Sequence, residues 1–131
     1  MHQSFARWRP VSSIMAFCDN DGIAWTQEGV VVTLVPDGRR YDGHPTVRLC
    51  WPCIVSWRVT EESYREDCWI SDPSQVRSFF VSRASPELAQ LRLQSCLLPA
   101  STLHFLLVGA NLVVDVFADV YPTIECVSSG C

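Results

Sequence analysis

Residues 103–120 read LHFLLVGANLVVDVFADV, and this stretch decides the fold. Two apolar runs, residues 103–108 and 112–120, flank Gly109-Ala110-Asn111, which is typical of a tight hairpin loop. Nearly every position of both runs is apolar, whereas a strand with one face in water alternates apolar and polar residues. Strands that are covered on both faces occupy the middle of a sheet. The stretch therefore predicts a buried β-hairpin at the centre of a sheet.

Shorter β-type segments surround this hairpin. Residues 54–60 alternate, with Val55, Trp57 and Val59 on one face, which is typical of a half-buried strand. Further strands are predicted at 13–18, 23–26, 30–35, 47–49, 78–82 and 123–127, the first two joined by a turn at Asp19-Asn20-Asp21-Gly22. The pattern predicts one α+β domain over residues 1–127, in which a twisted antiparallel sheet, able to curl toward a barrel, carries one main helix. Residues 128–131 are expected to form a loose tail.

The main helix is predicted after Ser85. Ser85 is a good N-cap residue, Pro86 suits the first helical position, and the acidic Glu87 suits the positive end of the helix. Apolar residues recur at helical spacing and are expected to face the sheet: Ala89, Leu93, Cys96 and Leu97. Glu87, Gln90 and Gln94 fall on the opposite face, which we expect to meet solvent.

Cys50 and Cys53, in the sequence Cys-Trp-Pro-Cys, have the spacing of a redox disulfide or of half a zinc site. A redox pair sits at a helix N-terminus, which lowers the pKa of the first thiol, yet the residues after Cys53 alternate like a strand. A zinc site needs about four ligands, and no second closely spaced pair accompanies this one. We interpret the pair as the kinked entry to a strand, and its cysteines as small buried apolar residues.

His104 lies in the central hairpin, and Asp115 and Asp119 share one face of the partner strand. A histidine with two carboxylates is able to form an acid–base group. Because no nucleophile or oxyanion element is apparent nearby, we favour a hydrogen-bonded polar pair inside the core.

Composition narrows the classes of function. Hydrophobic residues make up 48% of the 131 residues, which is typical of a globular chain. The net charge of −4 disfavours nucleic acid as a partner. Seven cysteines, an odd number, and the lack of an apolar run long enough to cross a bilayer predict a cytoplasmic protein with no membrane contact.

An acidic cluster follows the alternating strand. It consists of Glu61, Glu62, Glu66 and Asp67, with Trp69 close behind. Acidic groups beside an aromatic side chain suit an interaction surface for a basic protein partner. The simpler interpretation of the carboxylates is a solvated surface.

Two segments carry a resemblance to known proteins. The first is residues 55–64, VSWRVTEESY, and the second is Ser85-Pro86-Glu87-Leu88 with the hairpin that follows it. Together they resemble small uncharacterised bacterial proteins, some of which are similar to immunity proteins of toxin systems. The resemblance covers the C-terminal half and implies an α+β fold and a protein-binding role, and it implies no catalytic residue.

We therefore expect a non-enzymatic protein-binding domain without a cofactor, whose partner could be a toxin. Association with further copies of the chain stays open. One alternative is a small-ligand-binding domain with a pocket between helix and sheet. The other alternative is a thiol redox or zinc protein built on Cys50 and Cys53.

Overall fold

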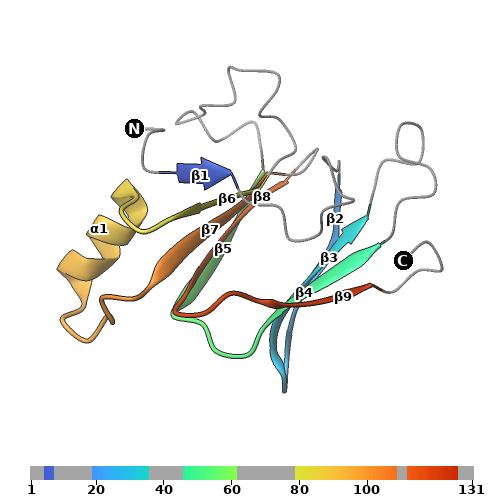
Figure 1. Ribbon diagram of the computed structural model, residues 1–131, viewed down its shortest axis with the longest axis horizontal. Coiled ribbons are helices and arrows are strands. Elements are labelled where there is room, and N and C mark those ends of the chain that lie inside the picture. The colour runs from blue at the N-terminus through green and yellow to red at the C-terminus, as the bar shows by residue number, and fades with distance from the viewer. Residues whose placement is uncertain (1–4, 8–18, 36–45, 62–78, 109–111, 127–131) are drawn as a thin grey trace.

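A computed structural model describes residues 5–7, 19–35, 46–61, 79–108 and 112–126 of the chain. The described residues form nine strands and one helix (Figure 1). In chain order these are β1 (Phe5–Arg7), β2 (Asp19–Thr26), β3 (Gly29–Val35), β4 (Val47–Trp51), β5 (Ser56–Glu61), β6 (Phe79–Ser82), α1 (Pro86–Gln94), β7 (Leu103–Val108), β8 (Leu112–Ala118) and β9 (Thr123–Cys126).

The predicted hairpin is confirmed as β7 and β8. They belong to a five-stranded sheet with the order β1-β6-β7-β8-β5, so β7 is its central strand. All six residues of β7 are buried, as the apolar pattern predicted. The neighbouring strands are antiparallel, and Leu103 faces Ala118 at one end of the β7–β8 pair while Val108 faces Val113 at the other.

The second sheet has four strands in the order β2-β3-β4-β9, all antiparallel, and β9 is the edge strand that was predicted for the C-terminal region. The predicted turn at 19–22 is wrong, because these residues belong to β2, where the register shifts between Asn20 and Gly22. The β2–β3 turn lies farther along, where Thr26 Oγ1 accepts from the Glu28 amide and Gly29 has a φ of 116°. The predicted strand at 13–18 lies outside the described residues.

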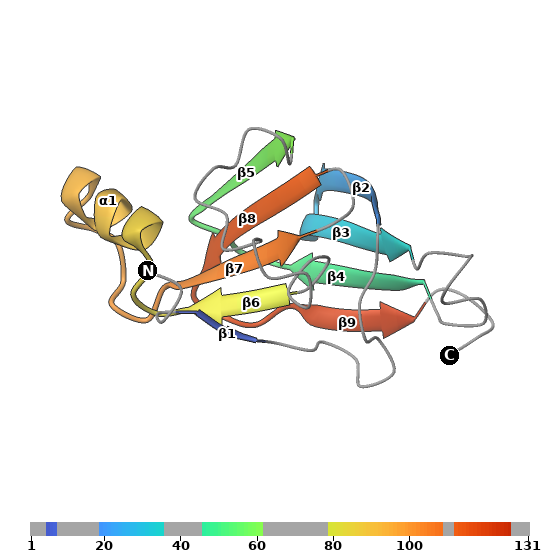
Figure 2. The same ribbon diagram turned by 90° about the horizontal axis from the view of Figure 1, so that it is seen from above.

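The two sheets pack face to face, with α1 on the far side of the five-stranded sheet (Figure 2). Between them lies a core from both sheets in which Trp51 of β4 meets Phe105 of β7, with ring centroids 5.3 Å apart.

We predicted one sheet able to curl toward a barrel. The described strands instead form two open sheets, because β4 turns away at Pro52 and β9 pairs with β4 rather than with β8.

The helix begins as predicted, because the Ser85 side chain caps it and Pro86 is its first residue. Its predicted orientation is wrong. Leu88 is the one fully buried residue of α1, and Leu91 is half-buried, whereas Ala89 and Leu93 point to solvent. The sheet beneath α1 presents polar groups of β7 and β8, so the helix meets it with Leu88 and with the face that carries Glu87.

No helix in the described part of the chain combines the length and the apolar character needed to cross a membrane. The tail predicted at 128–131 lies outside the described residues.

Candidate functional site

A buried polar pair occupies the face of the five-stranded sheet that lies toward α1. His104 on β7 pairs with Phe117 on β8, so Asp115, two residues earlier on β8, lies diagonally across from it on the same face. The His104 Nε2 atom lies 2.6 Å from Asp115 Oδ1, and both side chains are fully buried. Because an ionised carboxylate only accepts, we assign the Nε2 proton to the hydrogen bond with Asp115.

Ser85 extends this pair to the helix. Its hydroxyl oxygen lies 2.7 Å from His104 Nδ1 and accepts from the backbone amide of Leu88 at 3.1 Å. The Ser85 hydroxyl shares a hydrogen bond with Nδ1, and its oxygen also accepts the amide proton of Leu88. The N-cap therefore fastens the start of α1 to the central strands.

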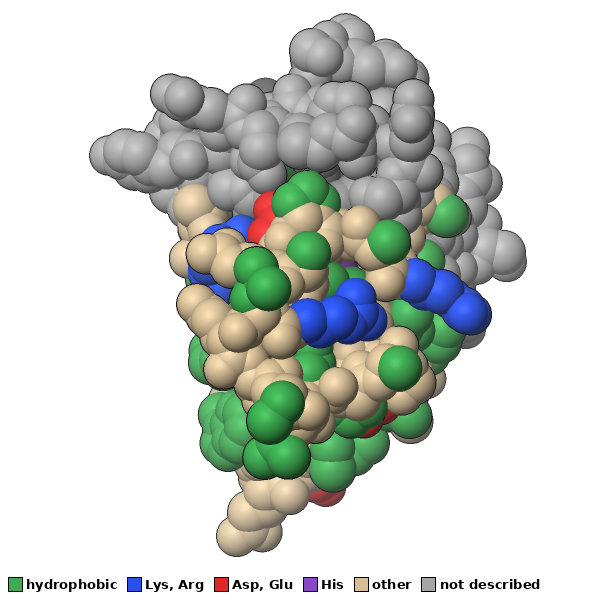
Figure 3. Space-filling model, turned by 90° about the vertical axis from the view of Figure 1, so that its left-hand side faces the viewer, with side chains coloured by type: hydrophobic (Ala, Val, Ile, Leu, Met, Phe, Trp, Pro, Cys, Tyr) green, Lys and Arg blue, Asp and Glu red, His purple; other side chains and the backbone are tan. Residues whose placement is uncertain are grey.

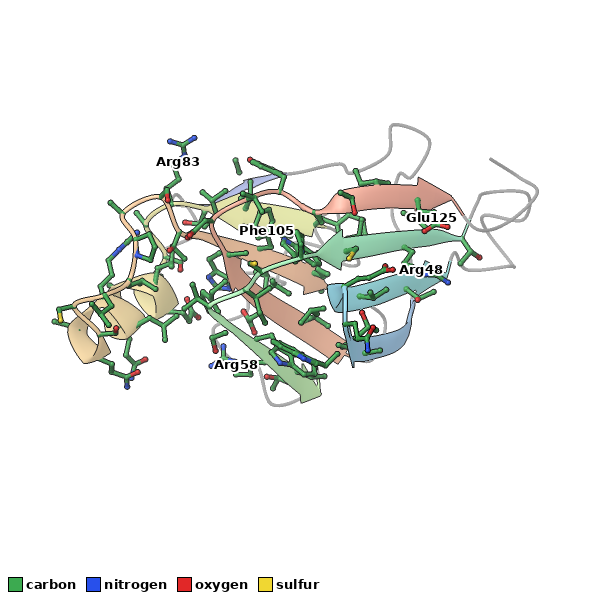
Figure 4. All side chains as sticks on the ribbon, turned by 90° about the horizontal axis from the view of Figure 1, so that it is seen from below. Arg48, Arg58, Arg83, Phe105 and Glu125 are labelled. Carbon is green, nitrogen blue, oxygen red and sulfur yellow. The ribbon has the colours of Figure 1, made fainter. Side chains whose placement is uncertain are left out.

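Arg58 of β5 extends the pair in the other direction. Its Nε and Nη2 atoms each lie 3.3 Å from Asp115 Oδ2, so Asp115 binds His104 with one oxygen and Arg58 with the other. The Arg58 side chain is half exposed. It leaves β5 on the side where α1 lies (Figure 4). The polar network Ser85–His104–Asp115–Arg58 thus joins α1, β7, β8 and β5.

A cavity of about 200 Å³ opens where this network reaches the surface. It lies between α1 and the outer face of the sheet. Arg58 and Phe117 line it from the sheet, and Glu87, Gln90, Leu91 and Gln94 line it from the helix. Glu87 Oε1 lies 3.9 Å from His104 Nδ1, so both charged groups of the wall contact the network. The alternative hypothesis of a small-ligand-binding domain predicted a pocket between the helix and the sheet, which is where this cavity lies.

The network has the order serine, histidine, aspartate of a hydrolase triad, but its surroundings differ from those of a nucleophile. Ser85, His104 and Asp115 are each fully buried. The Ser85 oxygen already accepts from Leu88, and a substrate carbonyl would have to displace the first turn of α1 to reach it. In this arrangement the network positions α1 and Arg58.

The three residues of the less favoured acid–base group are brought together only in part. Asp115 binds His104, whereas Asp119 lies beyond the end of β8 and accepts from Thr102 Oγ1 at 2.7 Å. The expectation of a polar pair in the core fits this geometry. Ser85 was recognised from the sequence as a cap, but its bond to His104 was missed, as was the role of Arg58. The available signal was the alternation of residues 54–60, which puts Arg58 on the face opposite to Val55, Trp57 and Val59.

Cys50 and Cys53 lie away from a helix N-terminus, as predicted, but their predicted burial is wrong, because Cys50 is half-buried and Cys53 is exposed. Cys50 lies in β4, Cys53 lies in the bend before β5, and neither is at a helix N-terminus. Both thiols are free, and Cys50 Sγ lies 3.5 Å from the backbone oxygen of Glu28. Within the described residues no group of three or more potential metal ligands gathers.

The predicted interaction surface falls largely outside the described residues. Glu61 is the last residue of β5, while Glu62, Glu66, Asp67 and Trp69 belong to the undescribed range 62–78. That surface stays a prediction.

Comparisons with protein-family models, with curated proteins and with solved structures returned no match.

Proposed function

We propose that this chain is a non-enzymatic, cytoplasmic protein-binding domain of the kind found among immunity proteins of toxin systems. The observation that carries the proposal is a set of exposed apolar residues on α1 and in the turn after it: Ala89, Leu93, Cys96 and Leu97. The side chains of Leu93 and Leu97 are 89% and 86% exposed. Apolar side chains reach the surface at several places on the side of the molecule that carries α1 (Figure 3).

The chemistry of this surface suits a protein partner. Burying a leucine side chain contributes about 1.5–3 kcal/mol, so two leucines that stay in water represent a large unused driving force. Exposed apolar side chains of a helix dock into the apolar grooves of other proteins. The burial of Ser85 and His104 supports the non-enzymatic part of the proposal, because the one serine–histidine–aspartate set among the described residues is engaged in holding α1.

A double substitution, Leu93→Ser with Leu97→Ser, tests the proposal. We expect the unfolding free energy to change by less than about 1 kcal/mol, because both side chains are in water. We expect partner binding to weaken at least about tenfold. The tagged chain would be used to recover proteins from an extract of its native host, with quantification by mass spectrometry, and the recovered partner would then be titrated against both chains.

Ile124→Ser is the matched control, because Ile124 is also an exposed apolar residue, at 42%, but lies on β9 in the other sheet. It should bind the partner like the unmodified chain. Recovery of no protein partner, or a partner that binds the double variant as tightly as the unmodified chain, would refute the proposal. If the partner is a toxin, co-expression of the chain should also abolish its toxicity.

A further inference from the structure

The cavity between α1 and the sheet has a charged group on each of its two walls. Arg58 approaches from β5, and Glu87 approaches from the first turn of α1. One face of α1 supplies the helix side of the cavity. It carries Glu87, Leu91 and Gln94 at i, i+4 and i+7, with Gln90 beside them.

The guanidinium of Arg58 is held in place by the buried Asp115. Asp115 is fully buried and receives Nε and Nη2 of Arg58 on one oxygen, while His104 fixes the other oxygen and is itself bonded to Ser85. An arginine side chain carries considerable rotamer freedom, and ordering it before a ligand arrives reduces the entropic cost of binding. The contacts with Asp115 use Nε and Nη2 of Arg58, whose side chain is half exposed and lines the cavity.

The rest of the wall is mixed in character. Gln90 and Gln94 provide amide donors and acceptors, and Leu91 and Phe117 provide apolar surface. Phe117 is fixed, because its ring lies 4.4 Å from the His104 ring and only 5% of the residue is exposed. A few polar groups converging over an apolar floor are typical of a small-molecule site.

We propose that this cavity binds a small zwitterion of the free α-amino-acid type. Its carboxylate contacts Arg58 and its ammonium group contacts Glu87. The amides of Gln90 and Gln94 contact a polar side-chain group where the ligand has one, as serine does, and its carbon skeleton rests on Phe117. This function goes beyond protein binding and does not depend on it.

The size of the cavity limits the ligand. A volume of about 200 Å³ lies below the ~300–1,000 Å³ that is typical of sites for drug-sized ligands. A small amino acid such as alanine or serine suits a cavity below that range. L-alanine and L-serine are therefore the probes of choice.

The experiment follows backbone amide signals of the isotope-labelled chain by NMR during titration. L-alanine and L-serine should shift the signals of Leu91 and Phe117 in a saturable way. Propionate lacks the ammonium group and ethylamine lacks the carboxylate, so each should bind at least about tenfold more weakly, because each loses one charge-assisted contact. Equal binding of either single-charge compound would overturn the zwitterion assignment.

Two variants locate the site. Glu87→Gln should weaken L-alanine binding about tenfold or more, and Arg58→Gln should do the same if that variant folds. Glu125→Gln is the control, because Glu125 forms an exposed ion pair with Arg48 at 3.6 Å on the four-stranded sheet (Figure 4). The Leu93→Ser, Leu97→Ser chain should keep its affinity for L-alanine, which separates this site from the protein-binding surface.

Absence of saturable shifts with both amino acids would refute the proposal. Shifts that Glu87→Gln leaves unchanged would also refute it, because this substitution removes the carboxylate that contacts the ammonium group and leaves the bonds of Asp115 to His104 and Arg58 in place.

Discussion

Asp115 stands on a buried strand and binds side chains from two other strands. Its oxygens hold His104 of β7 and Arg58 of β5, and His104 in turn holds the cap of α1. Removing one member of such a buried set leaves the others without partners, which costs more than the set contributes when it is complete. Asp115 should therefore be among the most sensitive positions of the chain.

Asp115→Ala should lower the free energy of unfolding by about 3 kcal/mol, because His104 Nε2 is left buried without an acceptor. Arg58 adds less to this loss, because its half-exposed side chain can turn to water. Asp119→Ala is the control and should cost about 1 kcal/mol or less, since Asp119 is exposed and bonds Thr102, which is not a member of the network. Urea denaturation of both variants makes the comparison, and equal losses would contradict this account.

Among the elements, the β2–β3 hairpin depends on one backbone conformation. Gly29 has a φ of 116°, which side chains rarely adopt, and a Cβ atom at this position would overlap the carbonyl oxygen of Trp51 and come within 2.7 Å of Pro52 Cα. The hairpin turn therefore packs directly on the end of β4, where the chain leaves the sheet.

Gly29→Ala should destabilise the protein by about 2–5 kcal/mol, from the unfavourable φ and from the overlap together. Glu28→Ala alters the neighbouring exposed position, where a change within about 0.5 kcal/mol is expected. Thermal unfolding monitored by circular dichroism would compare the two. A melting temperature for Gly29→Ala equal to that of Glu28→Ala would show that the turn tolerates a side chain.

The orientation of α1 shows why an element can be located from sequence and still be misplaced. Its N-cap and first turn are local signals, and Ser85 and Pro86 mark them plainly. Which face turns inward depends on what the sheet offers. His104 and Asp115 make the sheet polar beneath α1, so the rule that the apolar stripe is buried fails there.

For the whole molecule, the apolar pattern of β7 and β8 predicted the centre of one sheet, but no local sequence pattern predicted a second sheet. The pairing of β4 with β9 joins segments far apart in the chain. Leu49 and Ile124 pair in it, and no local sequence pattern indicates that they are neighbours. The same holds for the candidate site. His104 and Asp115 belong to one hairpin, so the sequence predicted that they are close together. Ser85 and Arg58 lie in other segments and contact them only in the folded chain.

The core between the sheets predicts one cooperative unit. Leu49 lies in the four-stranded sheet and Phe105 in the five-stranded sheet, and both belong to the same buried cluster. Leu49→Ala and Phe105→Ala should each cost about 2–5 kcal/mol and keep a single unfolding transition. Tryptophan fluorescence and far-ultraviolet circular dichroism should give coincident curves for each variant. Separate transitions for the two probes would show that the sheets unfold independently.

The pairing of β9 with β4 has a kinetic consequence. Every strand of the five-stranded sheet except β1 lies in the chain segment between β4 and β9. Bringing β9 to β4 therefore closes a long loop, while β7 meets β8 across a three-residue connection. The β7–β8 contact forms at little entropic cost, and the β4–β9 contact forms at a high one. Before β9 pairs with β4, the N–H and C=O groups on that edge of β4 have no strand partner and can pair with a strand of another chain. Folding therefore competes with aggregation at this edge.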